Sequence, residues 1–535
     1  MFCTSAVVLV ACVGQLPAPP QLAVTSPERG LVQGDAGRIT VKGTALPGPS
    51  GAPVTAVTVD GAPATLAADG SFTADVDVST GAMLLETVAI SDDGGKAIDA
   101  RAVEVGQLRP VGTEIERAVT ATLSAQAFAR LSAAAGPILE TTDFTALLAP
   151  LQPMVSLGDD LANVKLSITK LAIGHAQISL TPVDGGLQFS AELDGLAFAA
   201  QADYAGALVV DGSTAVSANA DQVTIAGTLL VTPAGTAGFT TKLGSPAVRT
   251  TNLQLHASGL TGQVLDLVTN NLGSTVQSIV TSSAESALQP LLDDALGALA
   301  GPQQLDVLGL KLDLVASPSA LTFTPAGALV TMNLQAKIEG SESSPGYIFT
   351  PNGTPALDVT SGIQLALADD LLNELLAEVH ARGLLDVHLR GDFGPFDTAD
   401  FKLALPPMIS ANTGDGSLRL VLGDMIATLG NHGTPAVSAA VNASVELAIL
   451  RGNDPQQIAL QLGKAELFVN LLDPRGGDAG GADLSGAANA GLAVQLDSLS
   501  QFLITVPLPA VAGVSLDSLS LRGDSGYVVA GAQIH

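Results

Sequence analysis

The chain has 535 residues, of which 47% are hydrophobic and 14% charged, and its formal net charge is −29. This acidic excess disfavours nucleic acid as a partner and direct adhesion to anionic lipid headgroups, because both need clustered Lys and Arg. Aromatic residues make up 3%, with no Trp, which argues against the aromatic girdles of a membrane-embedded barrel. No apolar run reaches the roughly 18 residues of a spanning helix. We therefore expect the apolar surface to lie inside, in large cores or in a lined cavity.

Residues 1–20 are interpreted as an export signal and tether. A short apolar run, residues 5–11, ends in the letters LVAC, with Leu9 three residues before Cys12. This arrangement resembles a bacterial lipobox, so Cys12 is the candidate lipidation site. No Lys or Arg precedes the run, which departs from the usual signal, and a plain secretory signal is the alternative. We therefore expect an exported protein: either a lipoprotein of the bacterial cell envelope, held at the outer membrane or surface through Cys12, or a secreted protein.

Residues 21–106 are predicted to form an all-β sandwich. Their apolar residues alternate with others in short runs, as expected for strands with one buried face. Turns are predicted at Asp60-Gly61, Asp69-Gly70 and Asp93-Gly94. The sequence around these turns resembles bacterial immunoglobulin-like modules, which are spacers or adhesive units, although a Cys pair and a Trp are absent. Calcium binding by the Asp residues is the alternative, but turn formation explains Asp-Gly more simply.

Residues 107–339 are predicted to form a first half of strands and helices. Residues 114–135 have apolar residues at helical spacing and predict a helix. Residues 164–251 then alternate apolar and polar side chains, which predicts long antiparallel strands with one apolar face. Strands with the same pattern return at residues 321–338.

The most regular stretch of the chain, residues 260–299, lies between these two groups of strands. Its apolar residues recur about every four positions, close to the period of an amphipathic helix. They are Leu260, Val264, Leu265, Val268, Leu272, Val276, Ile279 and Val280. Pro290 is expected to kink or restart the helix. A helix this apolar among strands is expected to lie against the apolar face of a sheet.

Residues 340–357, rich in Gly, Pro and Ser, are interpreted as a linker to a second half at residues 358–535. The second half repeats the order of helix and strands, beginning with a predicted helix at residues 363–385. The apolar face of this helix carries Leu371, Leu375 and Val379, and its acidic residues are interpreted as a solvated face: Asp369, Asp370, Glu374 and Glu378.

The remainder of the second half is predicted to be mainly strands. The predicted strands are residues 418–422, 441–449, 458–462, 514–521 and 527–534. A weaker helix is predicted at residues 490–502, which includes Val494 and Leu499, although its first part also fits a strand.

No catalytic constellation is found, and the protein is interpreted as a non-enzyme without a cofactor. The letters GDSG at residues 523–526 match the nucleophile motif of trypsin-like proteases, but they lie between the two closing strands, where Gly, Asp and Ser form an ordinary turn. The six histidines are scattered, without a paired spacing, so no metal site is expected. Cys3 and Cys12 are the only cysteines, which leaves no disulfide framework and no Cys-based zinc site.

The ordered series of elements in residues 118–535 resembles the bactericidal/permeability-increasing and lipopolysaccharide-binding protein family of the tubular lipid-binding superfamily. The segments that carry the resemblance are 164–200 (the family's first strand pair), 276–290 (VQSIVTSSAESALQP, its long helix), 360–385 (the opening helix of its second half), and 506–509, 514–521 and 527–532 (its closing Pro-Leu-Pro and last two strands). The resemblance implies an α+β fold shaped like a boomerang. Two barrel-like antiparallel β halves, each with long helices, would flank a central sheet.

The resemblance also implies that each half encloses an apolar tunnel for lipid acyl chains. We therefore expect binding, and transfer, of a phospholipid or similar lipid. The residues expected to line the tunnels are Leu123, Phe128, Leu131, Val264, Val268, Leu272, Val276 and Ile279 in the first half, and Leu371, Leu375, Val379, Val494 and Leu499 in the second. For each of these residues, ordinary core packing is the alternative to ligand contact.

Two departures from the family bear on the ligand. The family's disulfide between the early strands and the long helix cannot form, because no Cys follows Cys12. Members that bind lipopolysaccharide use a basic N-terminal tip, whereas the opening helix here carries only Arg117 and Arg130; this favours phospholipid. The alternative function is a non-catalytic surface protein, structural or adhesive, that has the same fold with its pockets filled by side chains.

Overall fold

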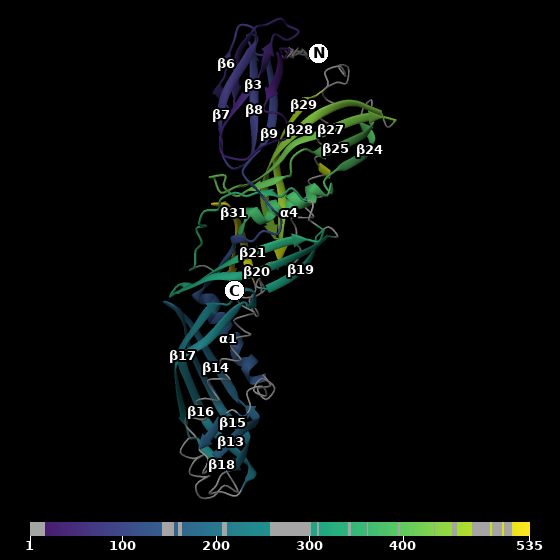
Figure 1. Cartoon of the computed structure of the whole chain (residues 1–535). Coiled ribbons are helices and arrows are strands. Elements are labelled where there is room, and N and C mark those ends of the chain that lie inside the picture. Colours follow the sequence, from purple (N-terminus) through teal and green to yellow (C-terminus); the bar gives the residue numbers. More distant parts are fainter. Residues whose placement is uncertain are drawn as a thin grey trace, which may run out of the picture.

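The computed structural model describes residues 17–141, 153, 155–158, 163–205, 211–256, 301–307, 310–340, 344–360, 362–393, 396–432, 434–451, 457–472, 493–494, 506–507 and 516–534. These residues are mostly in β-sheets, together with the helices α1 (Ala125–Thr141) and α4 (Asp369–Ala381). Figure 1 shows an elongated molecule with a β-sandwich at one end, a sheet of long strands at the other and further sheets between them. Within the described residues, no helix combines the length and apolar character needed to cross a membrane.

The N-terminal sandwich consists of a four-stranded sheet, in the order β1-β3-β7-β6, and a five-stranded sheet, in the order β2-β9-β8-β4-β5. Its core includes Val41, Val59 and Val103, all fully buried. The strands are β1 (Gln21–Ser26), β2 (Leu31–Gln33), β3 (Gly37–Leu46), β4 (Val54–Val59), β5 (Ala62–Pro63), β6 (Thr65–Leu66), β7 (Ser71–Val78), β8 (Gly81–Ser91) and β9 (Lys96–Val105). The expected β character is confirmed, whereas membership of the immunoglobulin-like class stays a prediction.

The Asp-Gly sequences of the sandwich form turns, as predicted. Asp60 and Gly61 have φ angles of 47° and 77° and connect β4 to β5. Asp69 Oδ1 accepts hydrogen bonds from Ser71 N (3.0 Å) and Ser71 Oγ (2.7 Å). The positive φ angles and the hydrogen bonds within the turn explain why Asp and Gly occur here, without a bound cation.

A central seven-stranded sheet, in the order β19-β20-β21-β11-β23-β32-β31, joins distant parts of the chain. Its strands are β11 (Ile115–Ser124), β19 (Gly301–Val307), β20 (Leu310–Thr324), β21 (Gly327–Ile338), β23 (Ile363–Ala368), β31 (Leu516–Asp524) and β32 (Tyr527–Ile534). The two closing strands predicted from the sequence are thus confirmed, and they pair with each other and with β23.

The two helices predicted at residues 114–135 and 363–385 begin too early. Residues 115–124 of the first form β11 and residues 363–368 of the second form β23, and both strands lie inside the central sheet. In β11, Val119 pairs with Met332 on one side and Leu367 on the other. A central strand buried on both faces does not alternate apolar and polar residues, so its sequence is easily mistaken for part of the helix that follows.

The first half contributes a second seven-stranded sheet, with the main order β12-β13-β15-β16-β17, in which β14 pairs with β15 and β18 with β16. Its strands are β12 (Val155–Gly158), β13 (Asn163–Ala172), β14 (His175–Val183), β15 (Gly186–Ala205), β16 (Gly212–Pro233), β17 (Phe239–Thr251) and β18 (Gln254–His256). The pairings leave β12 and β17 at opposite ends of the main order. The expected barrel-like closure is therefore not made by strand pairing among the described residues.

The second half contributes another sheet, in the order β24-β25-β27-β28-β29-β30, with β26 paired to β27. Its strands are β24 (Val387–Phe393), β25 (Phe396–Leu403), β26 (Met408–Ser410), β27 (Leu418–Asn431), β28 (Thr434–Arg451), β29 (Gln457–Leu471) and β30 (Val506–Pro507). The predicted linker is partly packed: β22 (Tyr347–Ile348) is buried and pairs with β10 (Leu108–Arg109).

Some predictions lie outside the described residues. They are the lipidation site Cys12, the helix at residues 260–299 with Val264, Val268, Leu272, Val276 and Ile279, and Leu499.

Candidate functional site

The first-half sheet has a long apolar side, formed by alternating residues of its strands. β15 alone has 20 residues and extends about 66 Å. The buried apolar residues of the sheet are Val164, Leu166, Ile168, Leu171, Ala176, Ile178, Leu180, Leu187, Phe189, Ala191, Leu193, Leu196, Phe198, Ala200, Ala202, Val216, Ala218, Ala220, Val223, Ile225, Leu229, Val231, Phe239 and Leu243. The buried positions of β15 change from odd to even numbers between Leu193 and Leu196, at Gly195, whose φ of 63° favours glycine.

Helix α1 covers one edge of this sheet. It lies along β14 (Figure 1), and its side chains accept hydrogen bonds from backbone N–H groups of that strand. Ser132 Oγ accepts from Leu180 N (2.8 Å), and Glu140 Oε1 accepts from Ala176 N (3.0 Å). The helix therefore satisfies part of an otherwise unpaired strand edge. Its 17 residues extend about 26 Å, less than half the length of β15.

A hollow lies between α1 and β14, and we call it the α1–β14 hollow. Its volume is about 710 Å³, and its lining includes Ala129, Ala133 and Gly136 from the helix and Gln177 from the strand. Ala129 and Ala133 are exposed, so the hollow opens to solvent. Small side chains on this face of α1 leave room that larger ones would fill. A side chain at Gly136 would collide with the carbonyl oxygen of Ala176.

The predicted contact residues of the first half that the structure describes come together beside α1. Leu123, at the end of β11, and Phe128 and Leu131, on α1, are all buried and belong to one core cluster. The Phe128 ring packs against Phe323 of β20, with 6.2 Å between ring centroids and 52° between the ring planes. These side chains form a packed core at the inner end of the apolar side.

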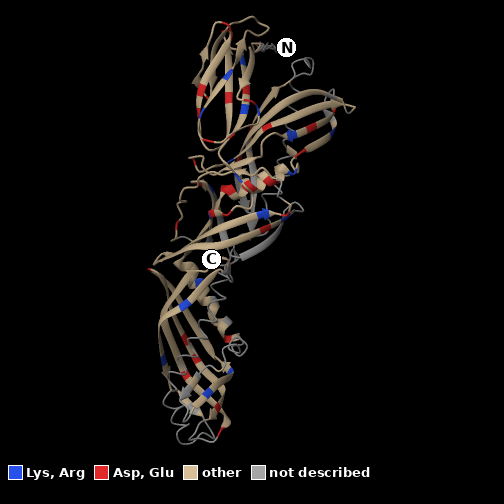
Figure 2. Cartoon of the chain, in the orientation of Figure 1, with Lys and Arg blue, Asp and Glu red and all other residues tan. Residues whose placement is uncertain are grey.

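Helix α4 in the second half is buried on every side, and this corrects the interpretation of its acidic residues as solvated. Leu371, Leu375 and Val379 are buried as expected for an apolar face. However, Asp370 and Glu374 are each 0% exposed, and Asp369 and Glu378 are also buried. In Figure 2 the acidic residues of α4 appear as red segments of the helix ribbon, in the middle of the molecule. The spacing of these residues fits a solvated face equally well, so the helix sequence alone does not reveal their burial.

The carboxylates and an amide of α4 hold neighbouring segments of irregular backbone. Asp370 Oδ1 accepts from Thr350 N (2.8 Å), and Glu374 Oε1 accepts from Gly112 N (2.6 Å). Asn373 bonds both the N–H and the carbonyl of Ile409, at 2.7 and 3.0 Å. These bonds compensate in part for removing the polar groups from water. They tie α4 to the segments before β11, around β22 and at β26.

Burial changes the acidity of this group of carboxyls. Desolvation raises the pKa of Asp369 to about 7, that of Asp370 to about 6 and that of Glu374 to about 8. The Glu374 Oε2 atom is buried and has no hydrogen-bond partner among the described residues. Burial, followed by the charges of Glu374 and Asp370, raises the pKa of Tyr347. Near neutral pH, part of this cluster is therefore protonated.

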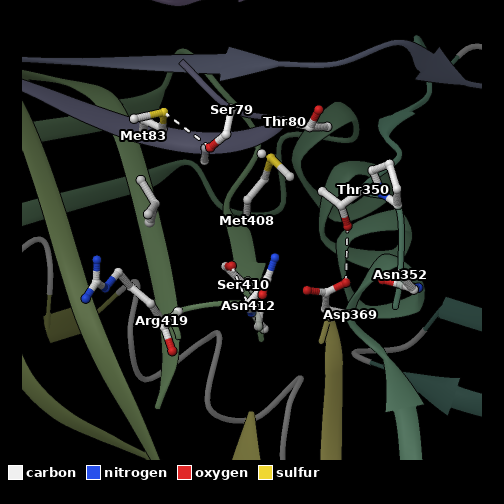
Figure 3. A pocket seen from close by; sticks show the side chains of 17 residues that line it. Ser79, Thr80, Met83, Thr350, Asn352, Asp369, Met408, Ser410, Asn412 and Arg419 are labelled. Carbon is white, nitrogen blue, oxygen red and sulfur yellow. Dashed lines mark hydrogen bonds between the residues drawn. The ribbon is translucent and has the colours of Figure 1, made fainter. Parts of the chain in front are cut away.

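A second cavity lies where the sandwich, the packed linker and the second half meet, and we call it the junction pocket. Its volume is about 450 Å³. Figure 3 shows its walls: Ser79, Thr80 and Met83 from the sandwich, Thr350 and Asn352 from the linker, Asp369 from α4, and Met408, Ser410, Asn412 and Arg419 from the second half.

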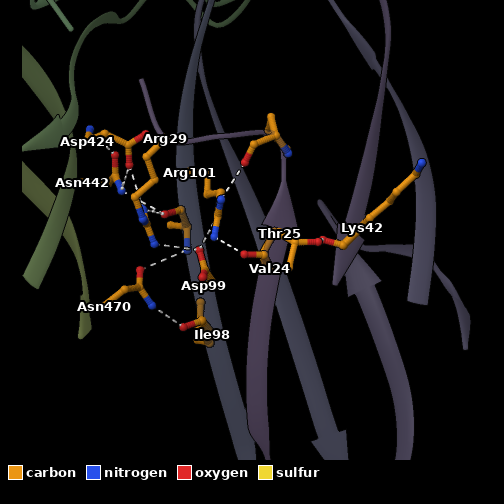
Figure 4. Close-up of polar contacts among 12 residues, drawn as sticks. Val24, Thr25, Arg29, Lys42, Ile98, Asp99, Arg101, Asp424, Asn442 and Asn470 are labelled. Atoms are coloured by element: carbon orange, nitrogen blue, oxygen red, sulfur yellow. Dashed lines mark hydrogen bonds and ion pairs between the residues drawn. The ribbon is translucent and has the colours of Figure 1, made fainter. Parts of the chain in front are cut away.

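A buried ion-pair network fixes the sandwich against the second half, and so fixes one wall of this pocket (Figure 4). Arg29 Nη1 lies 2.7 Å from Asp424 Oδ1, and Arg29 Nη2 lies 3.0 Å from Asp99 Oδ1. Asn442 Nδ2 donates to Asp424 Oδ1 (3.1 Å) and to the Ala100 carbonyl (2.9 Å). Arg29 and Asp424 are 395 residues apart, and no local sequence signal links them.

The remaining described residue among the predicted contacts, Val494, is 38% exposed. The sequence therefore groups correctly the residues that pack around α1 and those on the apolar face of α4. It does not identify the α1–β14 hollow, the junction pocket or the Arg29 network. The small residues Ala129, Ala133 and Gly136 are the one local signal that a hollow could lie beside α1.

Comparisons with known proteins give one curated relative and several solved structures. No protein-family model matches the chain. Over 238 residues the chain is 26% identical to the lipopolysaccharide-binding protein of Rattus norvegicus, a match that covers 42% of this chain and 48% of that protein. The chain thus spans about half the length of this curated relative.

Among solved structures, lipopolysaccharide-binding protein aligns with a TM-score of 0.41 and 16% identity, over 79% of this chain and 99% of that one. P47 of Clostridium botulinum E1 aligns with a TM-score of 0.27 and 8% identity, over 78% and 98%. The sequence match over 238 residues is weak homology to lipopolysaccharide-binding protein.

Proposed function

We propose that this chain binds lipid, with acyl chains held against the apolar side of the first-half sheet. The observation that carries the proposal is the α1–β14 hollow, whose volume of about 710 Å³ lies within the size range of ligand pockets. Its lining includes Ile178 and Leu180, which belong to the apolar side of the sheet. The weak homology to a protein named for binding lipopolysaccharide, and not for a catalysed reaction, supports a lipid ligand and a non-enzymatic role.

The finer part of the proposal concerns the headgroup and the cellular role. The chain has a net charge of −29, and α1 carries Arg130 as its single basic residue. Both features favour a neutral or zwitterionic phospholipid over a strongly anionic one. We further propose export, anchoring to the membrane through Cys12, transfer of the bound lipid, and a second binding region along the apolar face of α4. These parts rest on the sequence and need their own tests.

Apolar burial supplies enough free energy for such binding. Each buried CH₂ contributes about 0.8 kcal/mol, so a chain of about sixteen carbons contributes roughly 12 kcal/mol before the cost of ordering it. A ligand held mainly by its acyl chains would therefore remain bound through gentle purification. Native mass spectrometry of the full chain, purified without detergent, is expected to show co-purified lipid.

The absence of Trp from the chain allows a direct test of where the lipid lies. Gln177→Trp introduces a single fluorophore on the wall of the α1–β14 hollow, and Ala68→Trp introduces one on the exposed surface of the sandwich as a matched control. A phosphatidylcholine with brominated acyl chains is expected to quench the fluorescence of Gln177→Trp and to leave Ala68→Trp unchanged. Equal quenching of the two variants, or quenching of neither, would contradict the proposed site.

The alternative is a structural or adhesive surface protein whose pockets are filled by side chains. The packing of Phe128 against Phe323 favours it, because this part of the predicted tunnel wall contacts protein. The rigid attachment of the sandwich through Arg29 also fits a structural role. Under this alternative, no lipid would co-purify and neither Trp variant would be quenched.

A further inference from the structure

The junction pocket is a polar cavity that the proposed acyl-chain site does not use. It is lined by six separate parts of the chain, and most of its labelled side chains carry a hydroxyl, amide or charged group (Figure 3). A polar cavity of about 450 Å³ has room for several water molecules or for a small ligand. Such a cavity holds water or a small ligand, and the side chains that line it determine which small molecules can bind.

Several polar groups at the pocket have hydrogen-bonding capacity to spare. Ser79 Oγ has the Met83 sulfur as its partner, at 3.9 Å, and a thioether is a weak acceptor. Ser410 Oγ accepts a hydrogen bond from Asn412 N (3.3 Å), and its own O–H has no acceptor among the described residues. A bound molecule with several hydroxyl groups would pair with these side chains.

Arg419 gives the pocket a cationic wall. It lies on β27, is exposed to solvent, and its guanidinium offers a planar set of donors that suits phosphate and carboxylate groups. Glu446 lies opposite it on β28 and is also exposed, so water screens this neighbouring charge.

The other ionisable group in the pocket wall, Asp369, opposes an anion less than a free carboxylate would. Asp369 Oδ2 accepts a hydrogen bond from Ala411 N (3.0 Å), and Oδ1 accepts from Thr350 Oγ1 (3.2 Å). Burial raises the pKa of Asp369 to about 7, so the group is partly neutral near that pH. The charge balance of the pocket wall therefore leans towards Arg419.

We propose that the junction pocket binds a small hydroxylated organic phosphate, with the phosphate on Arg419 and the hydroxyl groups on Ser, Thr and Asn side chains. The apolar surfaces of Met83 and Met408 would contact the carbon skeleton. Such a group can come from a soluble metabolite or from a lipid headgroup, and the cavity size favours the soluble form. This inference does not depend on the acyl-chain site, which lies on the first-half sheet.

The position of the pocket couples ligand binding to the attachment of the sandwich. One wall, Ser79 to Met83, belongs to the sandwich, and the wall with Arg419 belongs to the second half. A ligand that bridges the two binds the attached arrangement only, and so stabilises it by mass action. The reverse also holds, because loss of the Arg29 network removes a wall of the pocket and weakens binding.

Isothermal titration calorimetry of the full chain with glycerol 3-phosphate tests the inference. Wild type is expected to bind glycerol 3-phosphate and not glycerol. Arg419→Gln is expected to bind at least about tenfold more weakly, because a charge-assisted phosphate contact is lost. Arg38→Gln, at an exposed arginine on β3 of the sandwich, is the matched control and should bind as wild type does.

Two further measurements make the result decisive. Circular dichroism identifies any variant that has lost its fold. If Arg419→Gln is unfolded, Ser410→Ala, a smaller change in the pocket wall, is tested in its place and is also expected to bind glycerol 3-phosphate more weakly. Flotation with phosphatidylglycerol vesicles separates the two sources of the phosphate. Absence of binding to glycerol 3-phosphate, equal affinity in Arg419→Gln and wild type, or binding to vesicles alone would each overturn the proposal.

Discussion

Glu374 offers a direct test of the acidic cluster on α4. Its side chain is 0% exposed, Oε1 accepts a hydrogen bond from Gly112 N (2.6 Å), and Oε2 has no partner in the described part of the chain. Glu374→Gln keeps an acceptor for the Gly112 N–H and removes the titrating proton. The variant should therefore fold as wild type does and differ from it in the pH dependence of its stability.

The expected magnitude follows from the raised pKa of Glu374. Burial raises the pKa of Glu374 from its ordinary value of 4.5 to about 8. Between these two values the folded chain holds a proton that the unfolded chain has released, so the free energy of unfolding falls as the pH rises. The stabilising contribution is complete below the unfolded value and is lost as the pH rises through about 8. From roughly pH 6 to pH 9 the loss is at most about 3 kcal/mol.

Urea unfolding followed by far-ultraviolet circular dichroism at several pH values measures this difference. Wild type should lose more stability than Glu374→Gln as the medium becomes alkaline, while Asp369 and Asp370 contribute the same slope to both. Glu116→Gln, at an exposed position of β11, is the control and should follow wild type. Hydrogen exchange of the α4 amides would locate the effect in the helix. Parallel pH profiles for wild type and Glu374→Gln would refute the reasoning.

Three further outcomes are expected. Arg29→Ala leaves the buried Asp424 carboxylate without its cation and should destabilise the attachment of the sandwich by roughly 3 kcal/mol. Proteolysis between the sandwich and the second half should therefore be faster than in wild type, whereas the control Arg38→Ala should be cleaved at the wild-type rate. Gly423→Leu should have a similar effect on proteolysis, because even a Cβ at Gly423 would lie 2.6 Å from a side chain of β9; normal protection would contradict this contact. Phe128→Ala should lower the free energy of unfolding by about 3–5 kcal/mol, measured by urea unfolding, and a loss under 1 kcal/mol would show that the ring is not core.

Local sequence patterns correctly predicted the Asp-Gly turns and many strands that have one buried face. Asp60-Gly61 adopts positive φ angles because these residues tolerate them, wherever they lie in the fold. The closing strand from Tyr527 also has the expected bounds. In these cases the residues that determine the structure are adjacent in sequence, so the pattern is sufficient.

The central sheet and its buried charges depend instead on distant partners. The letters IQLALA of β23 fit a helix, and they form a strand because β11 and β32 lie on either side of them. The spacing of Asp370 and Glu374 is that of a solvated helix face, and they are buried because the segments at Thr350 and Gly112 fold over them. Neither outcome is encoded in a window of local sequence.

The composition of the central sheet sets the order in which the chain can be completed during synthesis. β23 lies between β11, which leaves the ribosome early, and β32, which ends at Ile534. Until β31 and β32 emerge, one edge of β23 has no partner from them, and an open edge invites pairing with another chain. Removal of residues 516–534 would therefore leave β23 with an uncovered edge in the middle of the central sheet.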